Sequence, residues 1–373
     1  MNKELLHNKL IEWYEVNHRI LPWRETDDPY KIWISEIILQ QTRVAQGMEY
    51  YHRLITRFPD IQSLADAEED EVLLSWQGLG YYSRARNMHK AAQQMKNHEI
   101  FQLSNVVCQK LKDEEIFSSL RSMPGVGDYT AGAIASFAFN LPYPALDGNV
   151  YRVLSRLYDC EIAFDTTQGK KHFRQLAEEL LDKERPRLFN SAIMELGALH
   201  CVPTAPDCST CPLNTWCKAL TNNTVELLPV RKPRPKVRDR YFMYTIYITP
   251  DNTTLIHQRK GNDIWKHLWE FPLEETTKSF LPSTDTADNL QRSDLPSTGI
   301  ADLQRSDLSI THVLSHQKLH ARFIIKNVPE LPEIPDTVVV GLSDLDNYAF
   351  SRLTLKAIEK LLIPHRLFLP PKQ

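Results

Sequence analysis

The sequence predicts a mainly α-helical region over residues 1–220, followed by a smaller α+β domain. Apolar side chains recur at helical spacing in four segments of the first region. After residue 240 the chain becomes rich in aromatic and β-branched residues, which is typical of strands. With 373 residues, of which 42% are hydrophobic, the chain is long enough for two or three domains with their own cores.

Four amphipathic stripes define the expected helices of the first region. Each places apolar residues three or four positions apart, so that they share one helix face. The stripes are Val44, Met48, Tyr51 and Ile55; Ala85, Met88, Ala92 and Met95; Val150, Val153, Leu154 and Leu157; and Leu188, Ala192, Ile193 and Leu196. We expect their methionines to fill the core rather than to bind a cofactor.

Residues 222–240 separate the two regions. The stretch from Leu228 to Arg238 is rich in proline and basic residues and has no apolar period. It predicts an extended basic linker. Its cations could follow a phosphate backbone, or the segment could be a solvated spacer.

The second domain is predicted to hold a small mixed sheet. Strands are expected at residues 241–249, 319–326 and 337–341, and a helix at 351–362. Within 275–309, two short segments recur once each, which is too few copies for a repeat architecture. We expect residues 275–309 to be a polar, disordered insertion in a loop.

The composition restricts the setting and the partners. The net charge is −3, so binding to a polyanion would depend on local basic groups. The first thirteen residues contain charges every few positions, which argues against a signal peptide, and no apolar run is long enough for a membrane span. We therefore expect a cytosolic chain, in which clustered cysteines bind metal rather than form disulfides.

Four of the six cysteines fall within seventeen residues, with the spacing C-x6-C-x2-C-x5-C. They are Cys201, Cys208, Cys211 and Cys217. Zinc sites usually combine two short C-x2–4-C pairs, and only one such pair is present. The longer arms favour a [4Fe–4S] cluster, whose corners are farther apart than the ligands of one ion. From the cysteine spacing alone, a zinc site and a site without metal both remain alternatives.

The segment from Met123 to Ala131 contains Gly125 and Gly127 between two predicted helices. Spaced glycines permit a sharp turn and a close approach of a phosphate to the backbone, and the following helix presents unpaired N–H groups. This is the form of a helix-hairpin-helix, which binds DNA phosphates without reading sequence. By itself, the segment could equally be a tight turn.

Two carboxylates could form a catalytic pair. Glu36 is surrounded in sequence by apolar residues, and a carboxylic acid that stays protonated in a desolvated pocket can act as a general acid. Asp147 precedes a predicted helix and could be an N-cap, a carboxylate kept ionised by helix N–H groups, or both. Cleavage of an N-glycosidic bond needs one group to protonate the leaving base and another to stabilise the sugar cation. An isolated Glu36 could instead simply face solvent.

Together these features resemble the MutY family of adenine DNA glycosylases, within the helix-hairpin-helix superfamily that includes endonuclease III. The resemblance covers nearly all of residues 20–220 in order. The matching segments are residues 21–24, 29–30, 35–42, 78–86, 123–131, 146–150, 194–198 and the four cysteines.

The resemblance implies a helix-hairpin-helix glycosylase fold in three parts. A six-helix domain would cover residues 29–135, and an iron–sulfur helical domain would combine residues 1–28 and 136–221. The basic linker, residues 222–240, would then lead to a Nudix-like lesion-recognition domain at 241–365. The four cysteines would hold a [4Fe–4S] cluster, because their spacing matches the loop of the family.

The resemblance also implies roles for individual residues. Glu36 would protonate adenine and Asp147 would stabilise the sugar cation, while Tyr129 and Asn149 would order the pocket. The remaining positions would contact the flipped base or the surrounding DNA: Trp23, Arg24 and Glu195 at the adenine, Gln41 and Tyr81 in the base stack, and Arg84, Gly125 and Gly127 at the backbone.

The implied substrate is double-stranded DNA with adenine opposite 8-oxoguanine or guanine, bound by a monomer in a bacterial cytosol and nucleoid. Bifunctional relatives carry a lysine where this chain has Tyr129, and a phenol does not form a Schiff base. We therefore expect adenine release without efficient strand cleavage.

The second domain matches the family at residues 265–272 and 312–316, with Ser315 and His316 expected at the lesion. Leu314 replaces the usual aromatic residue, and His267 replaces the usual glycine. The glutamate motif of Nudix hydrolases is absent, so we expect no pyrophosphohydrolase activity.

Two other functions agree less well with the sequence. An endonuclease III-like glycosylase/lyase would not need the extra domain or Tyr129. A non-catalytic iron–sulfur DNA-binding protein would not need Glu36, Asp147 and the Gln40–Gln41 pair together.

Overall fold

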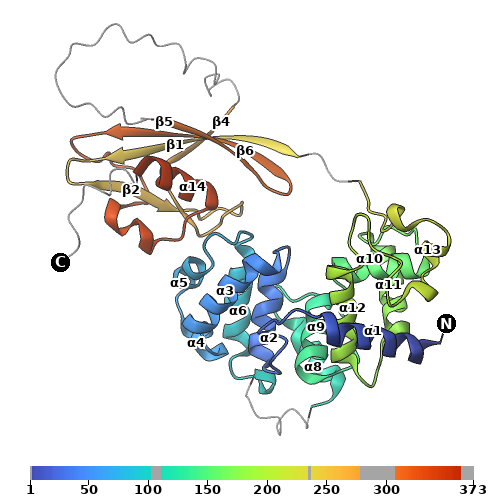
Figure 1. The fold of residues 1–373 in the computed structure, drawn as a ribbon. Coiled ribbons are helices and arrows are strands. Elements are labelled where there is room, and N and C mark those ends of the chain that lie inside the picture. The colour runs from blue at the N-terminus through green and yellow to red at the C-terminus, as the bar shows by residue number, and fades with distance from the viewer. Residues whose placement is uncertain (1, 102–110, 234–236, 278–306, 363–373) are drawn as a thin grey trace. The chain divides into compact units, whose positions relative to one another are not determined.

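The computed structural model describes residues 2–101, 111–233, 237–277 and 307–362, and divides the chain into two compact units (Figure 1). One unit combines Met1–Ala67 with Arg86–Pro233, and the other combines Glu68–Ala85 with Arg234–Gln373. The second unit thus includes a short helical segment from the middle of the predicted helical region.

The first unit is helical, as predicted. Its described helices are α1 (Lys3–Asn17), α2 (Pro29–Leu39), α3 (Val44–Arg57), α4 (Ile61–Asp66), most of α6 (Ser83–Met95), α8 (Asp113–Ser122), α9 (Asp128–Phe139), α10 (Gly148–Tyr158), α11 (Thr167–Leu180), α12 (Pro186–Leu199) and α13 (Lys218–Thr221). Short 3₁₀ turns lie at η1 (Glu99–Phe101), η2 (Asn214–Trp216) and η3 (Val225–Leu227).

The predicted stripes are largely the buried faces of these helices. All four stripe residues of α6 and all four of α10 are buried, as are three of the four in α12. The stripe of α3 is displaced, because its buried residues are Gly47, Tyr50, Tyr51 and Leu54. Three of these four, Gly47, Tyr50 and Leu54, lie one position before a residue of the predicted stripe.

Helix α2 is central to the unit, because nearly every side chain from Pro29 to Ile38 is buried. It begins at Pro29, a favoured first position, and Asp28 caps it by accepting from the N–H groups of Tyr30 and Lys31. Helices α3 and α9 pack against it. A carboxylate on such a helix must therefore find its partners inside the protein.

The predicted hairpin is present as α8, a turn at residues 123–127, and α9. Gly125 has a φ of +79°, which favours glycine, whereas Gly127 has an extended backbone and caps α9. The predicted positive φ is thus correct for Gly125 only.

Residues at both ends of the predicted linker, residues 222–240, have defined contacts or structure. Lys232 N donates to Asp165 Oδ1 at 2.9 Å, and Phe164 N donates to Val230 O at 3.3 Å, so residues up to 232 pack on the helical unit. Arg238 already begins the first strand.

The second unit contains two sheets. The strands are β1 (Arg238–Ile248), β2 (Thr253–Gln258), β3 (Trp269–Glu270), β4 (Leu273–Thr276), β5 (Asp307–Val313), β6 (Gln317–Asn327) and β7 (Thr337–Gly341). One sheet has the order β4-β1-β6-β5 and the other β3-β2-β7. The β1–β6 pair is parallel and the other pairs are antiparallel.

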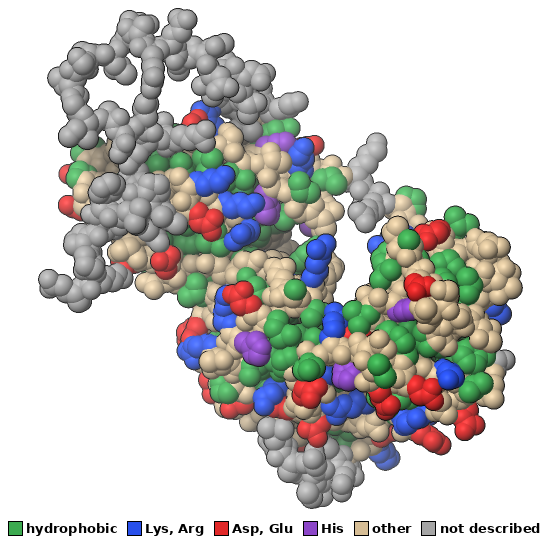
Figure 2. Space-filling view, in the orientation of Figure 1, with side chains coloured by type: hydrophobic (Ala, Val, Ile, Leu, Met, Phe, Trp, Pro, Cys, Tyr) green, Lys and Arg blue, Asp and Glu red, His purple; other side chains and the backbone are tan. Residues whose placement is uncertain are grey.

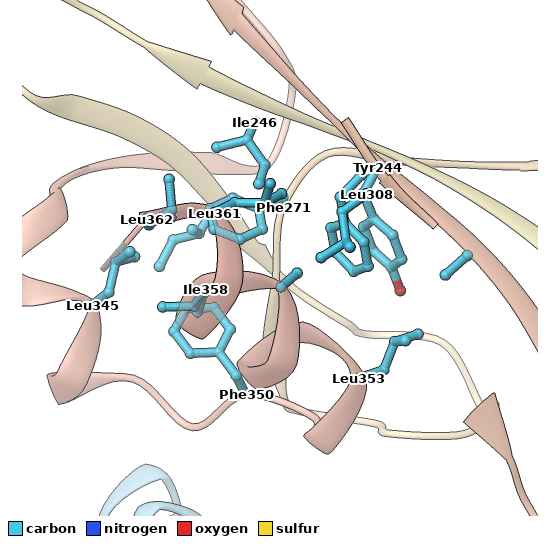
Figure 3. Packing of buried hydrophobic residues seen from close by; sticks show 14 of the residues in the cluster. Tyr244, Ile246, Phe271, Leu308, Leu345, Phe350, Leu353, Ile358, Leu361 and Leu362 are labelled. Carbon is cyan, nitrogen blue, oxygen red and sulfur yellow. The ribbon is translucent and has the colours of Figure 1, made fainter. Parts of the chain in front are cut away.

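The remaining helical elements of this unit are α5 (Glu69–Ser75), the start of α6, a 3₁₀ segment η6 (Leu342–Asn347), α14 (Arg352–Ala357) and a π turn (Ile358–Leu362). Apolar residues of the strands and of the last helical segment form one core. In Figure 3, Leu361 lies beside Phe271, and Phe350 lies against Ile358.

The predicted strands and final helix correspond to β1, β6, β7 and the segment Arg352–Leu362. Strands β2 to β5 were missed, because they are short or interrupted by polar residues. The ends of the expected insertion are strand residues, since residues 275–276 belong to β4 and 307–309 to β5. Residues 278–306 lie outside the described part. No helix in the described ranges has the length and apolarity required to cross a bilayer.

A close helix contact at Gly197 generates a prediction about stability. A Cβ there would lie 2.7 Å from Asn149 Cβ and 3.0 Å from its backbone, so Gly197→Ala should lower the free energy of unfolding by about 1–3 kcal/mol. Gly148→Ala is the matched control, because a Cβ there meets nothing within 4 Å. Equal stability of the two variants in chemical denaturation would contradict the tight α10–α12 contact.

Candidate active site

A cavity of about 580 Å³ opens among the helices of the first unit. It gathers residues from α1, α2, α3, α9, α10, α11 and α12 and from the loops on both sides of α2 and before α10. Its lining includes both predicted catalytic carboxylates, together with Trp23, Arg24, Gln41, Tyr129, Asn149 and Glu195. The structure therefore brings together eight of the site residues predicted from the sequence.

Glu36 lies on the inner face of α2 and is only 1% exposed. Its Oε2 accepts a 2.7 Å hydrogen bond from Tyr129 Oη, and Arg24 Nη1 lies 3.5 Å from its Oε1. The alternative of a solvent-facing glutamate is wrong. The phenol hydroxyl that contacts this oxygen can donate or accept a hydrogen bond.

Asp147 is the N-cap of α10, as predicted, and it lines the cavity as well. Its Oδ1 accepts from Asn149 N and Val150 N, and its Oδ2 accepts from Asn149 Nδ2, all at 2.8 Å. Burial raises the pKa of Asp147 above its ordinary value of 3.8, while these N–H donors act in the opposite direction. The carboxylate is thus poorly solvated but held by three donors that favour its ionised form.

Tyr129, in the first turn of α9, connects the two carboxylates electrostatically. Burial, followed by the nearby charges of Glu36 and Asp147, raises the pKa of Tyr129 well above 10. The phenol therefore keeps its proton at neutral pH and can direct it toward Glu36. It cannot serve as an anionic nucleophile there.

One wall of the cavity is made by Trp23, Arg24 and Glu195. Trp23 is 1% exposed and packs edge-on against Tyr51, while the Arg24 guanidinium lies 3.7 Å from the Phe137 ring centroid. Both side chains are thereby fixed in position.

Glu195 depends on a residue that sequence reasoning missed. Arg19 donates to it with N, Nε and Nη2 at 2.6–2.9 Å. Burial acts to raise the pKa of Glu195, but the Arg19 donors outweigh it and hold the pKa below its ordinary value. Tyr14, Lys170 and Ser191 also line the cavity without having been predicted. The spacing of these residues in the sequence gives no signal, because they come from three different helices.

Gln41 follows α2, has a φ of +58° and lines the same cavity, as expected for a residue at its mouth. Arg84, which was predicted at the DNA, is 8% exposed in the second unit. Its Nη2 donates to Gly80 O at 3.2 Å, and its guanidinium lies over the rings of Trp76 and Tyr81. These contacts of Arg84 hold the loop around Tyr81. The side chain of Tyr81 is 48% exposed.

Ser315 and His316 occupy the turn between β5 and β6 of the second unit. Both are exposed, and Ser315 Oγ lies 3.0 Å from His316 Nδ1. Leu314, the departure from the expected aromatic, instead packs against the core of that unit.

The four cysteines line one small cavity of about 30 Å³, together with Arg156. Arg156 Nη1 lies 3.4 Å from Cys201 Sγ, and burial raises the pKa of the Cys211 thiol to about 12. Within the described ranges, no three His, Cys, Asp or Glu side chains are arranged to hold a single metal ion. The four cysteines predicted to act together therefore line the same cavity.

Acidic and basic side chains are interspersed over the molecular face shown in Figure 2. This agrees with the small net charge of −3. Any contact with a polyanion therefore depends on local groups rather than on the overall charge.

Both parts of the chain match known protein families. Residues 34–183 match the HhH-GPD superfamily of base excision DNA repair proteins, and residues 243–360 match the NUDIX domain. An adenine DNA glycosylase of Buchnera aphidicola (strain Sg) is 33% identical over 91% of this chain and 92% of its own length. That of Schizosaccharomyces pombe is 30% identical over 95% and 88%.

Among solved structures, a thermostable thymine-DNA glycosylase has a TM-score of 0.51 at 23% identity. The alignment covers 59% of this chain and 97% of that one, and it supports the fold only. The two relatives extend over almost the whole chain, and the resemblance found in the sequence is confirmed: the chain belongs to the adenine DNA glycosylase family.

Proposed function

We propose that this chain hydrolyses the N-glycosidic bond of adenine opposite 8-oxoguanine or guanine in double-stranded DNA, leaving an abasic site. The observation that carries the proposal is a pair of carboxylates, the buried Glu36 and the half-buried Asp147, which line one cavity in different environments. Family membership makes the chain a DNA N-glycosylase of base excision repair. The choice of opposite base is part of the proposal.

Glu36 serves as the general acid. Its carboxyl lines the cavity, and Tyr129 Oη can accept a hydrogen bond from the acid or donate one to the carboxylate as the reaction proceeds. Transfer of the Glu36 proton to the extruded base turns adenine into a neutral leaving group.

Asp147 faces the positive charge that develops on the sugar. Three N–H donors hold its carboxylate without neutralising it, so it remains available to the cation. Asn149 donates twice to Asp147 and also accepts from Arg152 Nη2 at 2.9 Å, so that the amide is fixed in one orientation.

We further propose that Cys201, Cys208, Cys211 and Cys217 hold a [4Fe–4S] cluster. When bound, such a cluster would supply structural cross-linking rather than chemistry at the sugar. The Arg156 cation beside Cys201 would offset its negative charge. Because Tyr129 stands where an amine would be needed, we expect no efficient strand cleavage.

Single-turnover kinetics with defined duplexes test the proposed reaction. The wild-type protein should release adenine from 8-oxoG:A and G:A duplexes, and thymine glycol should remain. Glu36→Gln should slow adenine release by about 10²–10⁴-fold, because the amide has no acidic proton to deliver. Duplex affinity should stay within a few fold.

The matched control is Glu49→Gln, which changes an exposed carboxylate on α3. It should release adenine at the wild-type rate. Near-normal release by Glu36→Gln would remove Glu36 from the acid role, and release of thymine glycol without adenine would refute the proposed substrate.

Asp147→Asn should reveal the raised pKa of Asp147 through the pH dependence of stability. The native carboxyl binds its proton more tightly than the unfolded one, so its contribution to stability declines as pH rises from 3.8 through the raised pKa. The asparagine variant lacks this decline. The difference in unfolding free energy, variant minus wild type, should therefore be more positive at pH 7 than at pH 4.

Asp147→Asn should also lower the rate of adenine release by about 10²-fold or more, because its side chain has no negative charge to stabilise the sugar cation. A stability difference independent of pH, measured by denaturant unfolding, would contradict the burial of an ionised Asp147.

Cys208→Ser should lower the iron and acid-labile sulfide of the purified protein together. Cys160→Ser is the control, because Cys160 is absent from the lining of the cysteine cavity. Stoichiometric zinc without sulfide in the wild-type protein would exclude the iron–sulfur assignment.

A further inference from the structure

Helix α5 and the loop that follows it, residues 68–85, belong to the same compact unit as the C-terminal sheets. The first turn of α5 supplies one set of contacts. Glu69 Oε1 pairs with His267 Nδ1, while Asp70 accepts from Gln258 Nε2 at 2.9 Å and from Trp269 Nε1 at 3.3 Å. Two adjacent carboxylates are thus held by three side chains of the C-terminal domain.

A second set of contacts lies at the loop itself and involves the backbone of Phe350. Phe350 N donates to Gln77 Oε1 at 2.7 Å, and Phe350 O accepts from Tyr82 Oη at 3.1 Å. Tyr82 Oη also accepts from Gly78 N at 3.1 Å. The Phe350 ring is 1% exposed in the core shown in Figure 3, so this peptide is a rigid support.

Between Gln77 and Tyr82, three loop residues have a positive φ. The φ is 95° at Gly78, 81° at Gly80 and 49° at Tyr81. For Tyr81 this conformation costs free energy and persists only where surrounding contacts impose it. Trp76 Nε1 and Arg84 Nη2 both donate to Gly80 O, which closes the loop beneath Tyr81.

We infer that the C-terminal domain, through the Phe350 peptide held by Gln77 and Tyr82, fixes the loop that presents Tyr81 to the base stack. The inference rests on the proposed function, since it concerns the residue proposed to fill the gap left by the flipped adenine. It assigns Tyr82 as a positioning residue. The C-terminal domain then contributes to base extrusion as well as to contact with the opposite base.

His267, which replaces the glycine usual in the family, also supports the contact between the C-terminal domain and α5. His267 has a φ of +64°, a conformation that favours glycine, yet its side chain reaches Glu69. The contact with α5 offsets a backbone strain that a glycine would not have. His267→Gly should therefore loosen the support without straining the domain.

A double-mutant cycle in the full-length chain tests the inference. Tyr82→Phe keeps the ring but removes the hydroxyl between Gly78 and Phe350. It should slow single-turnover adenine release from an 8-oxoG:A duplex about five- to tenfold, the size of one or two lost hydrogen bonds. It should also reduce the fluorescence rise of 2-aminopurine placed at the adenine position, which reports extrusion.

In a Tyr81→Ala background, Tyr82→Phe should have almost no further effect, because the loop then presents no side chain to the stack. Tyr30→Phe is the control, since it removes a comparable hydroxyl-to-carbonyl bond, from Tyr30 Oη to Phe58 O. It should leave extrusion unchanged. His267→Gly should act in the same direction as Tyr82→Phe, with a smaller effect.

Equal slowing by Tyr82→Phe with and without Tyr81 would overturn the inference, as would normal extrusion in Tyr82→Phe. Failure of the proposed function is distinguishable, because the wild-type chain would then release no adenine at all.

Discussion

The burial of the Glu36 carboxyl against the Tyr129 hydroxyl is the constraint on which the site depends. A carboxyl that is 1% exposed needs a hydrogen-bond partner, and α9 supplies one because it packs directly against α2. The turn before α9 has the form of the predicted phosphate contact, and α9 itself places a neutral phenol on Glu36, the proposed general acid.

Helix α10 links the second carboxylate to the cysteine loop. Asp147 caps its start, and Arg152 Nε and Arg156 Nη1 donate to the carbonyls of Cys201 and Val202 at 2.7 Å. Arg152 Nη2 also reaches Asn149 Oδ1. The cysteine loop thus supports the helix that carries Asp147 and Asn149.

The sequence predicted the parts of the site that depend on local signals. Asp147 as a cap, the glycine turn and the apolar surroundings of Glu36 are all readable over a few residues, and the structure places Glu36 and Asp147 in one cavity. Arg19 was missed because its partner Glu195 is 176 residues away and only helix packing joins them. The DNA contacts expected of Arg84 and of residues 222–240 stay predictions. Their contacts within the protein, such as Arg84 Nη2 to Gly80 O and Lys232 N to Asp165 Oδ1, depend on tertiary packing and leave no local signal in the sequence.

Transfer of the Glu36 proton to the leaving base is the central step of the proposed reaction. Single-turnover release should be compared for adenine and for 7-methyladenine, a leaving group that already carries a positive charge and needs no proton. The deficit of Glu36→Gln, about 10²–10⁴-fold with adenine, should shrink to within about tenfold with 7-methyladenine, while Asp147→Asn keeps its deficit with both bases. An equal Glu36→Gln deficit for the two bases would show that Glu36 does not act by protonating the base.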